Sequence, residues 1–127
     1  MAWLYVALGG ALGAVLRYGV TGWVQGWTAG PFPWGTMTVN VVGSLLLGFA
    51  AAWLEAAATG PGVRQFAAIG LLGAFTTFST YSLEAVALLR DGDLWAAGGY
   101  VFGSLGAGLL AAVLGFGLAT WLLLPRG

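Results

Sequence analysis

The sequence predicts an all-α membrane protein, a single domain of four transmembrane helices that covers residues 1–127. Hydrophobic residues make up 60% of the chain and charged residues only 6%, with a mean hydropathy of +0.93. A soluble domain carries about a quarter charged residues, so this composition is typical of a membrane protein. Four long apolar spans with short connections fill nearly the whole chain and leave no room for a second domain.

The spans are expected at about residues 3–27, 34–58, 65–89 and 94–124. Each is longer than the roughly 20 residues that a helix needs to cross the hydrocarbon core. The first span lacks the basic start of a signal peptide and is too long for its apolar region, so we expect it to be the first transmembrane helix. Tryptophans near span ends fit the aromatic belts at the membrane surface, namely Trp3, Trp27, Trp34, Trp95 and Trp121.

The composition also narrows the classes of function. The chain has no Cys and no His, so it lacks thiolate ligands, the usual general base and the usual transition-metal ligand. We therefore expect no enzyme. A formal net charge of zero and the absence of any basic run argue against nucleic acid as a partner.

The positive charges divide evenly between the two sides of the membrane. Four spans place both termini and the second connection on one side, together with Arg64 and Arg126. Arg90 lies on the other side, toward which Arg17 points. Because a Lys/Arg bias normally fixes orientation, a balanced chain is compatible with insertion both ways and with an antiparallel homodimer. The alternative is that one loop or the insertion machinery selects a single orientation.

Small residues mark helix faces suited to close packing. They recur at every fourth position of the last span and in two pairs of the first: Gly99, Gly103, Ala107, Ala111, Gly115, Ala119, then Gly9 with Gly13 and Gly10 with Ala14. In lipid, where apolar burial drives little association, such faces let helices approach closely. We expect them to pack within or between subunits.

The second span carries a polar face of Thr36, Asn40 and Ser44, each four residues apart. An Asn in the middle of a span is costly unless its amide is paired or faces a cavity. Taken alone, Asn40 has two interpretations: a hydrogen bond between helices, or a group on a polar pathway.

The third span contains GAFTTFSTYS, residues 73–82, where glycines, hydroxyls and aromatic rings gather in the middle of the membrane. Such residues weaken a helix and compete for backbone groups, so the stretch predicts a helix break. Carbonyls freed at this depth must be buried in protein, face water or bind an ion, and discontinuous helices commonly bind cations this way. Beyond the break, Thr77, Thr80 or Tyr81, and Glu84 follow helical spacing, and the rings of Phe78 and Tyr81 can stack.

At these residues the chain resembles the CrcB/Fluc family of fluoride channels. The motifs are GALGAVLRY at 10–18, GTMTVNVVGSLLLG at 35–48 and GLLGAFTTFSTYSLE at 70–84. The third is very specific, and the others agree with the family in order and spacing. The resemblance implies a fluoride-selective channel of the prokaryotic cell membrane that lets fluoride leave the cytoplasm passively and lowers its toxicity. It also implies an antiparallel dual-topology dimer with two pores and a structural Na⁺ at its centre.

The resemblance further implies roles for single positions. The carbonyls of Gly73 and Thr76 would bind sodium, Asn40 would donate a hydrogen bond in the pore, and Phe78 would offer fluoride an aromatic edge. The remaining implied pore residues are Ser79, Thr80 and Glu84 on a polar rail, Tyr100 and Ser104 in the fourth span, and Thr36 at the pore mouth.

Tyr81 departs from the family, which usually has a second Phe at this position. Tyr keeps the positive ring edge and adds a hydroxyl, which could donate to fluoride, bridge to Ser or Thr, or narrow the path. Some similar chains in the family assemble as heterodimers, so a paired-chain arrangement stays open beside the homodimer.

Two other functions are compatible with a short four-helix chain. A proton-coupled exporter, like the small multidrug-resistance transporters, needs a carboxylate within the membrane, characteristically in the first helix. The first span has none, while Glu55 and Glu84 lie toward the ends of the second and third. A non-transporting structural subunit would explain the small-residue faces but not the hydroxyl and aromatic cluster.

Overall fold

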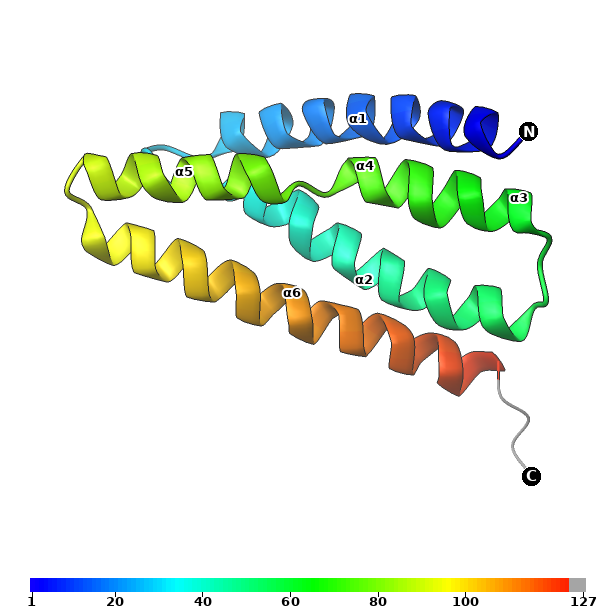
Figure 1. The fold of residues 1–127 in the computed structure, drawn as a ribbon. Helices are drawn as coiled ribbons and strands as arrows, with labels where there is room; N and C mark the ends of the chain where they lie inside the picture. The colour runs from blue at the N-terminus through cyan, green and yellow to red at the C-terminus, as the bar shows by residue number, and fades with distance from the viewer. Residues whose placement is uncertain (124–127) are drawn as a thin grey trace.

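The computed structural model describes residues 1–123 as an all-helical fold (Figure 1). Residue 124, the expected end of the fourth span, and Arg126 lie outside the described residues. Four stretches are long and apolar enough to cross a membrane, which confirms the predicted class of a four-span membrane protein. Three of the spans are single helices: α1 (Ala2–Trp27), α2 (Trp34–Ala56) and α6 (Leu94–Leu123). The third span consists of four elements in succession: α3 (Pro61–Val63), the π-helix η1 (Arg64–Leu72), α4 (Gly73–Phe75) and α5 (Phe78–Arg90).

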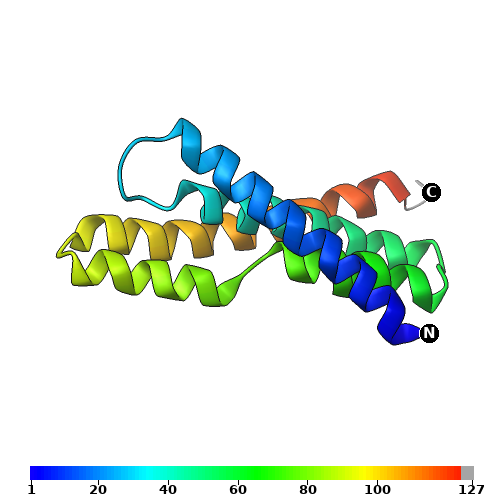
Figure 2. The same cartoon turned by 90° about the horizontal axis from the view of Figure 1, so that it is seen from above.

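The helices form a bundle in which α6 packs along α2, and α1 packs along η1 and α4. Helix α1 begins and α6 ends at the same end of the molecule, as an even number of spans requires (Figure 1). Seen from above, α1 crosses obliquely over the third span (Figure 2). The interruption of the third span consequently lies inside the bundle, between α1 on one side and α2 with α6 on the other.

Glycines allow the closest helix contacts. A Cβ added at Gly13 would collide with the Leu71 carbonyl of η1, and one at Gly115 would collide with the Leu45 carbonyl of α2. The expected small-residue faces are thus used, but unevenly. In α6, Ala111, Gly115 and Ala119 are buried, whereas a Cβ at Gly99 would meet nothing within 4 Å.

Side chains beside the loops fix the helix ends. Gln25 donates from Nε2 to the Phe32 carbonyl and accepts from the Gly35 N–H, both at 3.2 Å, so it ties the end of α1 to the start of α2. At the α5–α6 turn, Gly92 takes a φ of +80°, and Asp93 Oδ1 accepts the Ala96 N–H at 2.9 Å. An N-terminal cap of this kind satisfies a backbone donor that the helix leaves unpaired.

Between α4 and α5 the backbone is extended at two residues. Thr76 has φ −85° and ψ 158°, and Thr77 has φ −150° and ψ 121°. Helix α5 then begins at Phe78, with Thr77 as its N-cap: the Thr77 side chain accepts the Thr80 N–H at 3.3 Å. We call residues 76–77 the interruption.

Candidate functional site

Asn40 holds the interruption by two hydrogen bonds to a single residue. Its Nδ2 donates to the Thr77 carbonyl at 3.0 Å, and its Oδ1 accepts the Thr77 N–H at 2.8 Å. The amide oxygen therefore takes the place of the helical acceptor that the Thr77 N–H has lost, and the amide N–H adds a donor at the Thr77 carbonyl. The sequence left two interpretations open for Asn40, and the structure shows one of them directly, the hydrogen bond between helices. The side-chain amide also has a second N–H proton, which these two bonds do not use.

The same contacts withdraw donors from two carbonyls. In a continuous helix the Thr77 N–H would donate to the carbonyl of Gly73, and the Thr80 N–H to that of Thr76. Here the first N–H goes to Asn40 and the second to the Thr77 hydroxyl. Gly73 and Thr76, the two positions singled out for sodium, are thus the residues whose carbonyls lose a helical donor to a side chain.

One pocket, of about 540 Å³, lies beside the interruption between α2, α5 and α6. We call it the Asn40 pocket; four of the nine residues expected in the pore line it, namely Asn40, Phe78, Tyr81 and Ser104. Its lining includes Asn40, Ser44, Thr76, Thr77, Phe78, Tyr81 and Ser104. Phe78 is 80% exposed, so its ring is accessible at the surface of this pocket.

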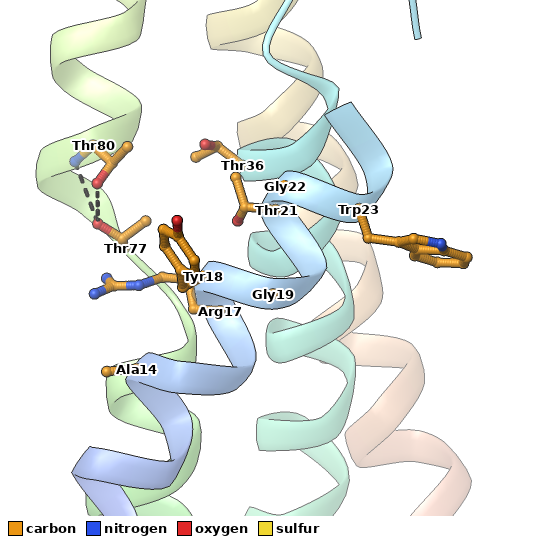
Figure 3. Close-up of a pocket in the computed structure, with 10 residues that line it drawn as sticks. All are labelled: Ala14, Arg17, Tyr18, Gly19, Thr21, Gly22, Trp23, Thr36, Thr77 and Thr80. Carbon is orange, nitrogen blue, oxygen red and sulfur yellow. Dashed lines mark hydrogen bonds between the residues drawn. The ribbon is translucent and has the colours of Figure 1, made fainter. Parts of the chain in front are cut away.

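A second pocket, of about 660 Å³, lies on the other side of the interruption, against α1 (Figure 3). We call it the Arg17 pocket. The Arg17 side chain extends from α1 toward the interruption, and hydroxyl groups surround the cavity (Figure 3). The hydroxyl-bearing residues that line it are Tyr18, Thr21, Thr36, Thr77 and Thr80. Thr77, which Asn40 holds by two hydrogen bonds, lines both pockets, so this residue separates the two cavities.

Glu84 is held by one hydroxyl from each neighbouring helix. Thr36 of α2 donates to Oε1 at 2.8 Å, and Tyr100 of α6 donates to Oε2 at 2.7 Å. Thr36 is 1% exposed and Tyr100 is fully buried. Three expected pore residues therefore meet in one cluster, with both carboxylate oxygens occupied.

Aromatic rings connect this cluster to the Asn40 pocket. The ring centroids of Phe78 and Tyr81 are 5.8 Å apart, those of Tyr81 and Tyr100 are 5.2 Å apart, and Phe32 meets Tyr100 edge-on at 5.6 Å. The predicted contact between the rings of Phe78 and Tyr81 is confirmed. The Tyr81 hydroxyl donates to the Val101 carbonyl of α6 at 3.1 Å, a partner that the sequence did not suggest.

The expected rail is less uniform than the sequence suggested. Ser79 is exposed and lines neither pocket, whereas Thr80, also exposed, lines the Arg17 pocket. The sequence did not predict that Asn40 holds Thr77 by two hydrogen bonds, or that Arg17 lines a pocket beside the interruption. A cation within an apolar span is the signal by which Arg17 could have been found.

Comparison with known proteins gives the family. The profile described as "CrcB-like protein, Camphor Resistance (CrcB)" matches residues 4–116, most of the chain. The chain belongs to this family. Relatives of this chain include proteins from two strains of Thermus thermophilus, 52% and 50% identical, and one from Opitutus terrae, 50% identical. The first match covers 91% of this chain and 91% of the relative, and the second covers 91% of this chain and 93% of the relative. The third covers 89% of this chain and 88% of the relative. Each of these relatives is named a fluoride-specific ion channel.

Family and fold agree on the nature of the molecule. The CrcB match runs through all four spans, and each relative aligns over nearly its full length. The chain is therefore a multi-pass membrane protein, as the composition predicted. The motifs that carried the resemblance, at residues 10–18, 35–48 and 70–84, all lie within the matched region.

Proposed function

We propose that this chain forms a fluoride-selective channel through which fluoride leaves the cytoplasm passively, lowering its toxicity there. The observation that carries the proposal is the Asn40 pocket, where an amide, an exposed ring and a hydroxyl that has no partner among residues 1–123 share one cavity. The relatives named as fluoride-specific channels support the choice of ion. In bacteria such a multi-pass chain resides in the plasma membrane.

The chemistry of the pocket suits a small, strongly hydrated anion. Such an ion gives up water only where donors replace it, and conduction requires that these donors hold it weakly. Ser104 offers a hydroxyl, Asn40 its second amide proton, and Phe78 the positive edge of its ring. Each is a neutral donor, so none of them traps the ion as a full charge would.

The two sides of the interruption contribute differently to this path. Arg17 gives its pocket a positive charge that favours an anion over an organic cation. Beyond the interruption, the hydroxyls of Thr36 and Tyr100 hold Glu84 in place as part of the polar rail. Thr80 lies at the Arg17 pocket, and Ser79 lies at the exposed surface near it. We assign these groups to the approach and the Asn40 pocket to the selective step.

The test is fluoride efflux from liposomes that contain only this purified chain, read with a fluoride electrode beside a chloride control. We expect fluoride loss without chloride loss and without a proton gradient. Phe78→Ile is expected to lower the flux about twofold to tenfold, because a ring-edge contact is worth about 0.5–1.5 kcal/mol. Phe78 is exposed, so its replacement leaves the fold intact.

Phe102→Ile is the matched control. Phe102 is 75% exposed on α6 and lines neither pocket, so this variant should conduct like the wild type. Equal flux from both variants would remove Phe78 from the path. Transport that requires a proton gradient would replace the channel by the proton-coupled exporter, and no transport by folded protein would favour a structural subunit or a missing partner chain.

We further propose that two copies assemble as an antiparallel dimer around a structural Na⁺. The carbonyls of Gly73 and Thr76 support this, since both lose helical donors and Gly73 is exposed on the surface of the single chain. Carbonyl oxygens of unwound helices suit Na⁺, which such breaks commonly coordinate. The partner is a second copy of this chain or a similar chain.

Sodium removal tests the ion and the dimer together. We expect the chain, purified alone in detergent with sodium, to have the mass of a dimer, and to lose it when a large organic cation replaces sodium. Potassium of equal ionic strength is the control for salt. A dimer that persists without sodium would remove the ion, and a monomer in sodium would remove the homodimer. For orientation, a cysteine introduced at exposed Asp91, whose backbone is in the right-handed helical region, should react in about half of the molecules with an impermeant maleimide added outside sealed vesicles.

A further inference from the structure

Tyr81 uses its hydroxyl in a way that affects a neighbouring residue. The hydroxyl donates to the Val101 carbonyl of α6 at 3.1 Å, while the ring lies against Tyr100 and lines the Asn40 pocket. The phenolic proton is therefore committed to a backbone carbonyl, and the ring rather than the hydroxyl faces the cavity. This removes the hydroxyl from direct donation to an ion.

The bond fills the acceptor capacity of the Val101 carbonyl. A backbone carbonyl has two lone pairs. In α6, a continuous helix from Leu94 to Leu123, the N–H of residue 105 takes one of them. Tyr81 takes the other, so the carbonyl has no acceptor position left for a third donor.

Ser104 is the residue that would ordinarily use this carbonyl. Serines within a helix commonly return their hydroxyl to the carbonyl three or four residues earlier, which here means Val101 or Tyr100. Ser104 is only 7% exposed, yet among the described residues its Oγ has no hydrogen-bond partner. It lines the Asn40 pocket. Leaving a buried hydroxyl unpaired is costly, so the vacancy needs an explanation.

We infer that Tyr81 is a positioning residue: by occupying the Val101 carbonyl, its hydroxyl closes one of the two backbone acceptors within reach of Ser104 and so favours donation of the Ser104 hydroxyl to an anion in the Asn40 pocket. The inference rests on the proposed channel function and names one donor and the residue that keeps it available. It also gives a role to the Tyr81 hydroxyl, for which the resemblance implied none.

A double-mutant cycle tests the coupling. In Tyr81→Phe the Val101 carbonyl regains an acceptor position, so Ser104 can bond to it and is withdrawn from the pocket. We expect Tyr81→Phe and Ser104→Ala each to raise the half-saturating fluoride concentration about threefold to tenfold, the range that one net hydrogen bond supports. The double variant should show no larger increase than either single variant, because both remove the same donor.

The controls separate this coupling from a general loss of packing. Ser82→Ala and Tyr5→Phe remove hydroxyls outside both pockets and should leave the half-saturating concentration unchanged. Replacing Tyr81 by 4-aminophenylalanine retains a donor for the Val101 carbonyl and should preserve the wild-type value.

Increases that multiply in the double variant would overturn the inference, since they would mean that Tyr81 and Ser104 act independently. An unchanged value for either single variant would overturn it as well. These outcomes leave the proposed function standing as long as the wild type conducts fluoride. A wild type that does not conduct would reject the proposed function itself.

Discussion

Asn40→Asp is expected to abolish measurable fluoride flux, with a fall of roughly a hundredfold or more. Two effects combine. The carboxylate cannot donate to the Thr77 carbonyl, so the bond from Asn40 Nδ2, worth about 0.5–1.5 kcal/mol net, is lost. The new negative charge also lines the Asn40 pocket, where at about 4 Å and an effective dielectric of about 20 it repels an anion by about 4 kcal/mol. Liposome efflux, measured with the thermal unfolding of the same preparation, reports both effects.

Thr38→Ala provides the matched control for this variant. Thr38 lies two residues away on the same helix but lines neither pocket, so its flux and unfolding temperature should stay near wild type. Asn40→Ala separates the two effects, because it removes both bonds to Thr77 without adding a charge. Flux within twofold of wild type in Asn40→Asp would contradict both the pinning of the interruption and the place of Asn40 on the path.

Gly115→Ala is expected to destabilise the fold, whereas Gly117→Ala two residues later in α6 is not. A Cβ at Gly115 would collide with the Leu45 carbonyl of α2 and lie 2.9 Å from the Phe49 nitrogen, and backbone cannot move aside as a flexible side chain can. Overpacking of this kind costs about 1–3 kcal/mol. A Cβ at Gly117 would meet nothing within 4 Å, and both variants gain the same helix propensity, about 1 kcal/mol.

The measurement is the unfolding temperature of the two variants in one detergent. We expect Gly115→Ala to unfold below the wild type and Gly117→Ala to match or exceed it. Because α2 carries Asn40, a shifted α2–α6 contact should also lower fluoride flux in Gly115→Ala. Equal unfolding temperatures for the two variants would show that the α2–α6 contact tolerates a methyl group and that this packing is looser than the structure indicates.

The sequence was sufficient to predict the spans because their evidence is local. Each span is a long run of apolar residues, and the described helices begin and end within a few residues of the expected limits; the third begins at Pro61 rather than near residue 65. The π-helical winding of Arg64–Leu72 was not foreseen. No run of residue types marks it, and its glycine contacts with α1 depend on how the helices pack.

The site was predictable in its residue types and less so in its pairings. Hydroxyls and rings at mid-membrane pointed to the segment that contains the interruption, and the four-residue spacing placed Thr36 and Asn40 on one face. That Asn40 binds Thr77 could not be predicted, because the pair is 37 residues apart and any Asn at that depth could bond many groups. The bond from Tyr81 to Val101 was hidden for another reason: its acceptor is a carbonyl, which every residue has.

The interruption also constrains the order in which the chain can settle in the membrane. Helix α5 has 13 residues and is therefore about 20 Å long, too short to cross a hydrocarbon core of about 30 Å by itself. The third span must thus carry the peptide of Thr77 into lipid, where an unpaired backbone is costly. The partner that satisfies this peptide, Asn40, lies in the preceding span and is synthesised first. Biogenesis of the third span consequently depends on a second span that is already in place beside it.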